Sequence, residues 1–124
     1  MSVNRFACAV VVLGLCIAIP AAALASKPRT VAPSSKQRTE ILKAFGEPKA
    51  GWRCMTVRLA ASNHNYATVR FHASRGCLRW AFNGMNVIKR KRDDQWAVRF
   101  EGSAFACPLA RIPRQVQRDL GVCP

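Results

Sequence analysis

The dipeptide Asn83-Gly84 separates two runs of strand-forming residues and is the strongest local fold signal in the chain. Asn-Gly readily supplies the positive φ angles of a two-residue type I′ turn, so the sequence predicts a β-hairpin centred on it. Such a turn fixes the register, placing Phe82 opposite Met85 and Trp80 opposite Val87. Because these four side chains are apolar, we expect them to face the core.

Alternating apolar and polar residues predict further strands on both sides of this hairpin. On the last of them, the side chains of Trp96, Val98 and Phe100 are expected to face inward. Short polar turns join all the strands, which favours an antiparallel meander. The five predicted strands are residues 55–60, 66–72, 77–82, 85–90 and 96–101.

Two short helices are predicted to flank the strands. Ser34 and Gln37 have the spacing of a capping box at the start of the first helix, and Gly46 is placed to end it. The second helix is expected between Pro113 and Gly121 and should dock its apolar side on the core. Three arginines around this second helix are expected to face water: Arg111, Arg114 and Arg118.

Residues 1–25 have the features of a cleavable signal peptide, with an apolar core too short to span a membrane comfortably. No transmembrane segment is expected after cleavage. Residues 26–35 are rich in proline and small polar residues and are predicted to form a flexible lead. Residues 36–124 then form a single exported domain, located outside the cell or in the cell envelope or periplasm.

Four cysteines remain after cleavage, and an even number in an exported domain predicts two disulfides. Three pairings are possible, of which we favour Cys54–Cys77 and Cys107–Cys123 because both close local loops. In a simple meander, however, Cys54 and Cys77 would lie about 9–10 Å apart, beyond the reach of a disulfide. A loop or bulge would have to bring them together.

The predicted fold class is therefore α+β: an N-terminal helix packed on a five-stranded antiparallel meander, with a short C-terminal helix and two disulfides. The chain has no Cys-x-x-Cys pair and only two histidines, so no metal site and no cofactor are expected.

The net charge of +14 favours anionic partners. Each predicted strand places one arginine on the outward face of the sheet, where a band of guanidinium groups would suit phosphates or carboxylates. Alternatively, the arginines only keep an exposed sheet face solvated, or the C-terminal helix covers part of that face. The run Lys89–Arg92 either grips phosphates or solvates a hairpin end. The candidate anion-binding residues are Arg58, Arg70, Arg79, Arg90 and Arg99.

The leading hypothesis is a non-catalytic binding module for an anionic envelope component, polymer or membrane surface. Tyr66 is the main aromatic residue expected on the outward face, which argues against sequence-specific nucleic-acid binding. One alternative is a small secreted hydrolase or nuclease that uses His64 or His72. Both histidines are also explained as ordinary loop and surface residues. The other alternative is a protein-interaction or inhibitor module.

The last third of the chain carries a pattern of spaced residues: Trp96, Val98, Gly102-Ser103, Cys107, Pro113, Val116, Asp119-Leu120 and Cys123. In this pattern the chain resembles small uncharacterised exported proteins of actinobacterial type. The likeness extends loosely back to Gln37–Phe45 and Cys54. The resemblance implies an exported, disulfide-bearing α+β domain, and it implies no activity or catalytic residues.

Overall fold

The computed structural model describes residues 27–124, and the predicted signal peptide lies outside the described residues. Five strands form one antiparallel sheet in the order β1-β2-β3-β4-β5, so the predicted sheet type and the α+β class are confirmed. The strands are β1 (Thr30–Val31), β2 (Met55–Ala60), β3 (Tyr66–Phe71), β4 (Met85–Arg90) and β5 (Trp96–Gly102). The helices are α1 (Ser35–Phe45) and α2 (Arg114–Leu120), with 3₁₀ turns η1 (Lys49–Cys54) and η2 (Leu78–Trp80).

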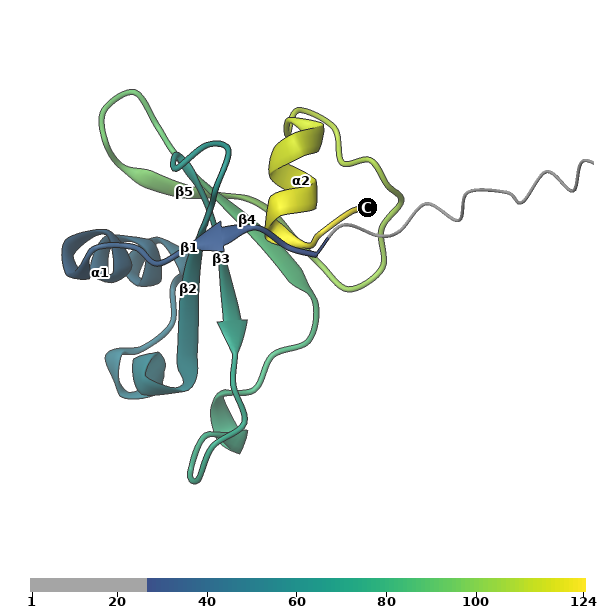
Figure 1. Ribbon diagram of the computed structural model, residues 1–124. Helices are drawn as coiled ribbons and strands as arrows, with labels where there is room; N and C mark the ends of the chain where they lie inside the picture. Colours follow the sequence, from purple (N-terminus) through teal and green to yellow (C-terminus); the bar gives the residue numbers. More distant parts are fainter. Residues whose placement is uncertain (1–26) are drawn as a thin grey trace, which may run out of the picture.

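Helices cover both faces of the sheet, with α1 on one side and α2 on the other (Figure 1). The sheet therefore has a core on each face. The expectation of one exposed basic face is wrong, and the alternative that the C-terminal helix covers part of that face is confirmed. The α1-side core consists of Ile41, Leu42, Met55, Val57, Leu59, Ala67, Val69, Ile88 and Trp96. The α2-side core consists of Ala60, Tyr66, Val87, Ile112, Val116, Leu120, Val122 and Cys123. None of the helices in the described part of the chain is long and apolar enough to cross a membrane.

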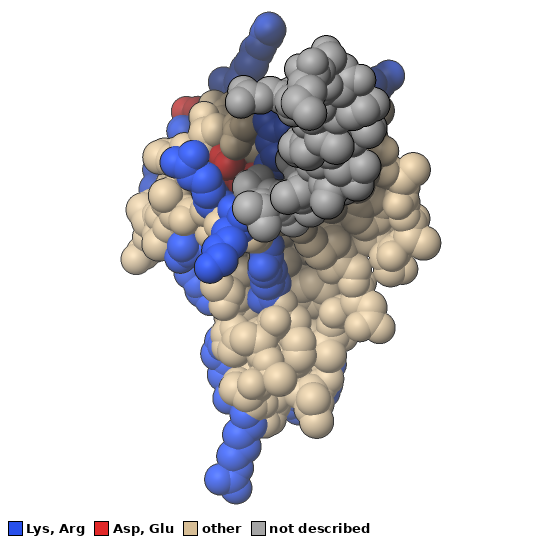
Figure 2. Space-filling model, turned by 45° about the vertical axis from the view of Figure 1, so that its right-hand side comes forward, with Lys and Arg blue, Asp and Glu red and all other residues tan. Residues whose placement is uncertain are grey.

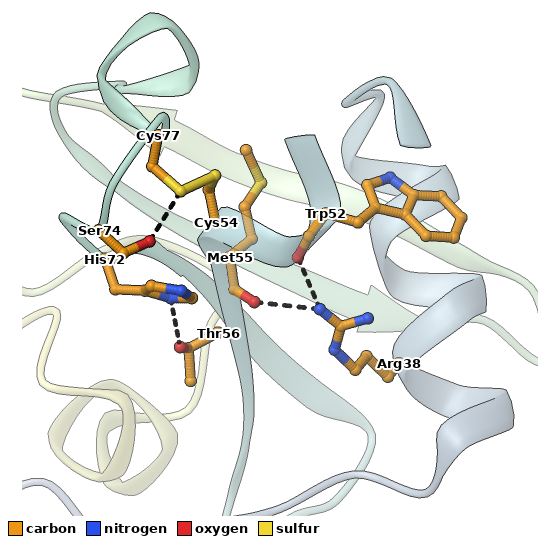
Figure 3. Close-up of a disulfide and its surroundings, with 8 residues drawn as sticks. All are labelled: Arg38, Trp52, Cys54, Met55, Thr56, His72, Ser74 and Cys77. Atoms are coloured by element: carbon orange, nitrogen blue, oxygen red, sulfur yellow. Dashed lines mark hydrogen bonds between the residues drawn. A yellow bond between two sulfur atoms is a disulfide. The ribbon is translucent and has the colours of Figure 1, made fainter. Parts of the chain in front are cut away.

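Helix α1 begins and ends where its local sequence signals lie. The Ser34 hydroxyl accepts a hydrogen bond from the Gln37 N–H, and the Gln37 side chain accepts one from the Ser34 N–H. Gly46 ends the helix in the left-handed conformation, with φ of 89°. The Arg38 guanidinium donates to the carbonyls of Trp52 and Met55, at 2.7 and 3.2 Å, and so ties α1 to the start of β2 (Figure 3).

The predicted hairpin at Asn83-Gly84 is wrong. Residues 78–80 form η2 instead of a strand, and the loop that carries them lies beyond one end of the sheet (Figure 1). Gly84 does have a positive φ, of 108°, but it leads from this loop into β4, where an added Cβ would lie 2.7 Å from the Gly102 carbonyl oxygen. The fifth strand is β1, which pairs with β2 and lies within the segment predicted to be a flexible lead.

Both predicted disulfides are confirmed. The Cys54–Cys77 bond joins Cα atoms 5.5 Å apart, and the Cys107–Cys123 bond joins Cα atoms 5.8 Å apart. The first pair is within reach because Cys77 lies in the loop before η2 and not on a strand, which removes the geometric obstacle expected for a simple meander (Figure 3).

A β-bulge in β5 changes which side chains share a face. Ile88 pairs with Val98 while the preceding Val87 pairs with Phe100, so β5 has one residue, Arg99, more than β4 at this step. Phe100 consequently packs on the α2-side core, whereas Trp96 belongs to the α1-side core. The prediction that these two aromatic residues face the same side is therefore wrong.

The buried carboxylate of Asp119 fastens α2 to the loop between β2 and β3. It accepts hydrogen bonds from the Ser62 N–H at 2.7 Å and from the Gln115 amide at 2.9 Å. Burial alone would raise the pKa of Asp119, but these hydrogen bonds and the charge of Arg29 more than offset it, so the pKa lies below its usual value of 3.8.

Replacing Asp119 with asparagine should lower the free energy of unfolding by about 1–2 kcal/mol at neutral pH, because charge-assisted hydrogen bonds are lost. Since the folded-state pKa is depressed, this contribution is present above pH 3.8 and disappears as the pH falls below it. Urea unfolding of the wild type and Asp119→Asn between pH 2.5 and 7 measures the difference. A difference that stays constant over this range would contradict the assignment.

Candidate anion-binding site

The five candidate arginines do not form one band. Arg58 donates to the hydroxyl and carbonyl oxygens of Thr30, at 3.0 and 3.1 Å, and so holds β1 against β2. Arg70 donates to the Leu120 carbonyl at the end of α2. These two guanidiniums therefore already bind backbone or side-chain oxygens of the protein.

Two more of the arginines lie elsewhere. Arg79 belongs to η2, and its guanidinium lies 5.3 Å from the centre of the Trp80 ring. Arg90 lies opposite Trp96 of the α1-side core in the register of β4 and β5. Its guanidinium forms an ion pair with the Asp94 carboxylate at 2.9 Å. The premise of one arginine per strand on a common face is thus wrong, because residues 77–82 are not a strand and both faces are covered.

Arg99 is the candidate that lies with other cations. It lines a hollow of about 330 Å³ on the α2 side of the sheet, which we call the basic hollow. Lys89 of β4 and Arg111, from the loop before α2, line the same hollow. Its lining residues are Lys89, Arg99, Ala110, Arg111 and Ile112.

Lys89 is positioned by the sheet and by an aromatic ring. It lies opposite Tyr66 in the register of β3 and β4, and its ammonium group is 5.4 Å from the centre of the Tyr66 ring. Tyr66 itself is buried in the α2-side core. The cation–π contact holds the Lys89 side chain over this core and leaves its N–H donors for another acceptor.

Local backbone irregularities position the two arginines. Arg99 is the extra residue of the β5 bulge, and bulges commonly re-aim a side chain beside a functional site. Arg111 has a φ of 63°, a left-handed conformation that costs a non-glycine residue about 1–2 kcal/mol. Such a cost persists only where the surrounding structure imposes it, and it often accompanies function.

Gln117 of α2 imposes the conformation of the loop that carries Arg111. Its buried side-chain amide accepts from the Leu109 N–H at 2.7 Å and donates to the carbonyls of Leu109 and Ile112, at 2.9 and 2.7 Å. These contacts bracket Arg111 on both sides.

Replacing Gln117 with leucine should release this loop, because three backbone groups lose their partner. We expect the free energy of unfolding to fall by about 2 kcal/mol, since the half-buried loop can recover part of its bonding from water. Affinity for an anion in the basic hollow should fall with it, as Arg111 loses its fixed position. Gln117→Glu keeps the acceptor but sets a second oxygen against the Leu109 and Ile112 carbonyls, so it should be at least as unstable as Gln117→Leu in urea unfolding. Equal affinity of Gln117→Leu and wild type for tripolyphosphate would contradict this positioning role.

The three cations of the basic hollow have no acidic partner in residues 27–124. The ion pairs described there join Lys36 to Glu40, Arg90 to Asp94, and Lys91 to Asp93. Figure 2 turns the α2 side forward and shows that basic side chains prevail over acidic ones on the visible surface. Clustered positive charges without counter-charges repel one another, and a bound anion would relieve that repulsion.

The two histidines do not come together. His64 precedes β3 and His72 follows it, so they lie at opposite ends of that strand. His72 shares a hydrogen bond of 3.1 Å with the Thr56 hydroxyl near the Cys54–Cys77 disulfide (Figure 3). Within the described residues, no group of three His, Cys, Asp or Glu side chains is placed to hold a metal ion.

Lys89 and Arg111 were not among the candidate residues. Lys89 alternates with Met85 and Val87, which were expected to face the core, and Arg111 was expected only to face water. The run Lys89–Arg92 was the available signal for Lys89, whereas nothing local in the sequence marks the left-handed Arg111.

Comparison of the chain with protein-family models, curated protein sequences and solved structures gave no match.

Proposed function

We propose that this protein is a non-catalytic exported binding module that holds phosphate or carboxylate groups of an anionic envelope component or polymer in its basic hollow. The observation that carries the proposal is the convergence of Lys89, Arg99 and Arg111 on one hollow without an acidic partner in the described residues. Guanidinium groups bind phosphate and carboxylate through parallel N–H donors, and an ammonium adds a compact charge.

Export is supported by the chemistry of the cysteines. Two disulfides join four of the described residues, and such bonds persist in oxidising compartments. The signal-peptide features of residues 1–25 agree with this location. An exported basic protein meets anionic polymers and head groups at the cell surface, and the basic hollow would give that encounter a fixed site.

Calorimetric titration of the oxidised protein with tripolyphosphate and with polyglutamate, at several salt concentrations, tests the site and separates the two chemistries. Arg111→Gln and Arg99→Gln should each weaken binding about fivefold, corresponding to about 1 kcal/mol for a partly exposed charge pair. Arg79→Gln is the matched control, because it removes one arginine charge from η2, outside the hollow. Equal losses for Arg79→Gln and Arg111→Gln would mean that only net charge matters, and the proposed site would fail.

Arg111→Gly separates binding from folding. Glycine accepts the φ of 63° without a Cβ clash, so the free energy of unfolding should not fall. Tripolyphosphate affinity should still fall as it does for Arg111→Gln. If the glycine variant is as stable as the wild type and binds as tightly, Arg111 has no part in the site.

A further inference from the structure

A second basic hollow adjoins the first. It has a volume of about 460 Å³ and lies between the β2–β3 loop and the β4–β5 hairpin. Lys89 lines both hollows, so the two share a wall. The lining residues of this second hollow are Asn63, Asn65, Tyr66, Lys89, Arg90, Lys91, Arg92 and Asp94.

A backbone hydrogen bond joins the two segments that form the second hollow. The Arg90 N–H donates to the Asn65 carbonyl at 2.8 Å. The Asn63 side-chain oxygen accepts from the Asn65 N–H at 3.0 Å, which leaves the Asn63 NH₂ group as a donor for another acceptor. The second hollow therefore presents a fixed amide donor beside the basic hairpin.

The acidic residues of the hairpin neutralise only part of its charge. Asp94 is engaged by Arg90, and Asp93 by Lys91. No ion pair is described for Arg92 within residues 27–124. Arg92 follows Lys89 by three residues, so their Cα atoms are at most about 10–11 Å apart. Cations without acidic partners thus run from Arg92 through Lys89 to Arg99 and Arg111.

We infer that the ligand is a linear polyanion that occupies both hollows at once and crosses at Lys89. This inference rests on the proposed function of the basic hollow and adds a ligand class to it: a flexible chain with closely spaced phosphate or carboxylate groups. Each hollow takes up anionic groups of the chain, so affinity grows with chain length through effective concentration.

The shape and composition of the hollows favour a linear chain over a lipid surface or nucleobases. Two concave sites separated by one side chain admit a thin polymer, whereas the head groups of a bilayer form an extended surface. Tyr66 is the one aromatic residue that lines either hollow, and it is only 5% exposed beneath Lys89. Base recognition needs exposed aromatic faces for stacking, so the charged groups of the chain are the recognised feature.

Calorimetry with inorganic phosphate, tripolyphosphate and long-chain polyphosphate tests the inference, with polyglutamates of two lengths as the carboxylate arm. Arg92→Gln should weaken long-chain binding about threefold, and it should weaken binding of inorganic phosphate less, because a single phosphate cannot span both hollows. Arg111→Gln should weaken both, and Lys89→Gln should cause the largest loss for long chains. Each lost contact should reduce the slope of log K against log salt by about one. Arg79→Gln is again the charge-matched control.

The outcomes separate the inference from the proposed function. If Arg111→Gln weakens binding and Arg92→Gln has no effect on any chain length, the basic hollow stands and the two-hollow inference fails. If Arg111→Gln has no more effect than Arg79→Gln, the proposed function fails as well. Vesicles of anionic phospholipid should bind more weakly than long-chain polyphosphate. Equal affinity for the vesicles, with the same loss in Arg92→Gln, would overturn the linear-polymer class.

Discussion

Replacing Asn86 with leucine is expected to lower the free energy of unfolding by about 4 kcal/mol, because buried backbone groups of β3 lose their partners. Strands β3 and β4 pair through two residue pairs, the last being Ala67 with Ile88, and then separate. At the point of separation, the Asn86 side chain accepts from the Val69 N–H at 2.8 Å and donates to the Val69 carbonyl at 2.7 Å.

The Asn86 side-chain amide thus makes the hydrogen bonds that a β4 peptide group would make if β3 and β4 stayed paired at this point. It is almost fully buried, so water cannot take over its hydrogen bonds, and each orphaned backbone group costs about 1–3 kcal/mol. Thr68→Val is the matched control, since the Thr68 hydroxyl makes only a 3.3 Å contact with the same Asn86 oxygen. The control should cost less than about 1 kcal/mol. Urea unfolding measures both variants, and similar losses for the two would contradict the bridging role.

The sequence correctly predicted the features that depend on residues close together in the chain. The capping box of Ser34 and Gln37 and the glycine that ends each helix act within one turn of chain, so reading them required no tertiary structure. The disulfide pairing was predictable for the same reason, because both bonds close short loops.

The Asn83-Gly84 signal failed because distant contacts decide the conformation of residues 77–82. Cys77 is tied to Cys54, and Trp80 packs so closely on Gly51 that an added Cβ there would lie 2.8 Å from its ring. These contacts hold the segment off the sheet despite its strand-forming composition. The short β1, with only two residues, has no alternation that could have revealed it.

The candidate site was only partly predictable because both faces of the sheet are cores. Alternation identifies a buried face when the other face meets water, but here Val87 and the adjacent Ile88 are both fully buried, on opposite sides. Alternation therefore groups Lys89 with Val87, but it does not show that this face, buried at Val87, lines a hollow at Lys89. The bulge at Arg99 and the left-handed Arg111 depend on pairing and on Gln117, which a one-dimensional pattern does not contain.

Removing the Cys54–Cys77 disulfide by a double alanine substitution is expected to lower the free energy of unfolding by about 3.5 kcal/mol in the chain-entropy model. The two residues are separated by 23 positions, and both are fully buried. The bond holds the η2 loop against the start of β2, at the end of the sheet shown in Figure 3. Amide hydrogen exchange should therefore accelerate first in residues 73–82.

The second disulfide provides the comparison that links stability to the proposed site. The Cys107–Cys123 bond has a sequence separation of 16, so its removal should cost about 3 kcal/mol by the same relation. Unlike the first bond, it closes the segment that carries Arg111. Under conditions where both double-alanine variants remain folded, the Cys107/Cys123 variant should lose tripolyphosphate affinity, while the Cys54/Cys77 variant should keep it. Equal affinity losses in two variants of similar stability would mean that binding follows overall stability and not the position of Arg111.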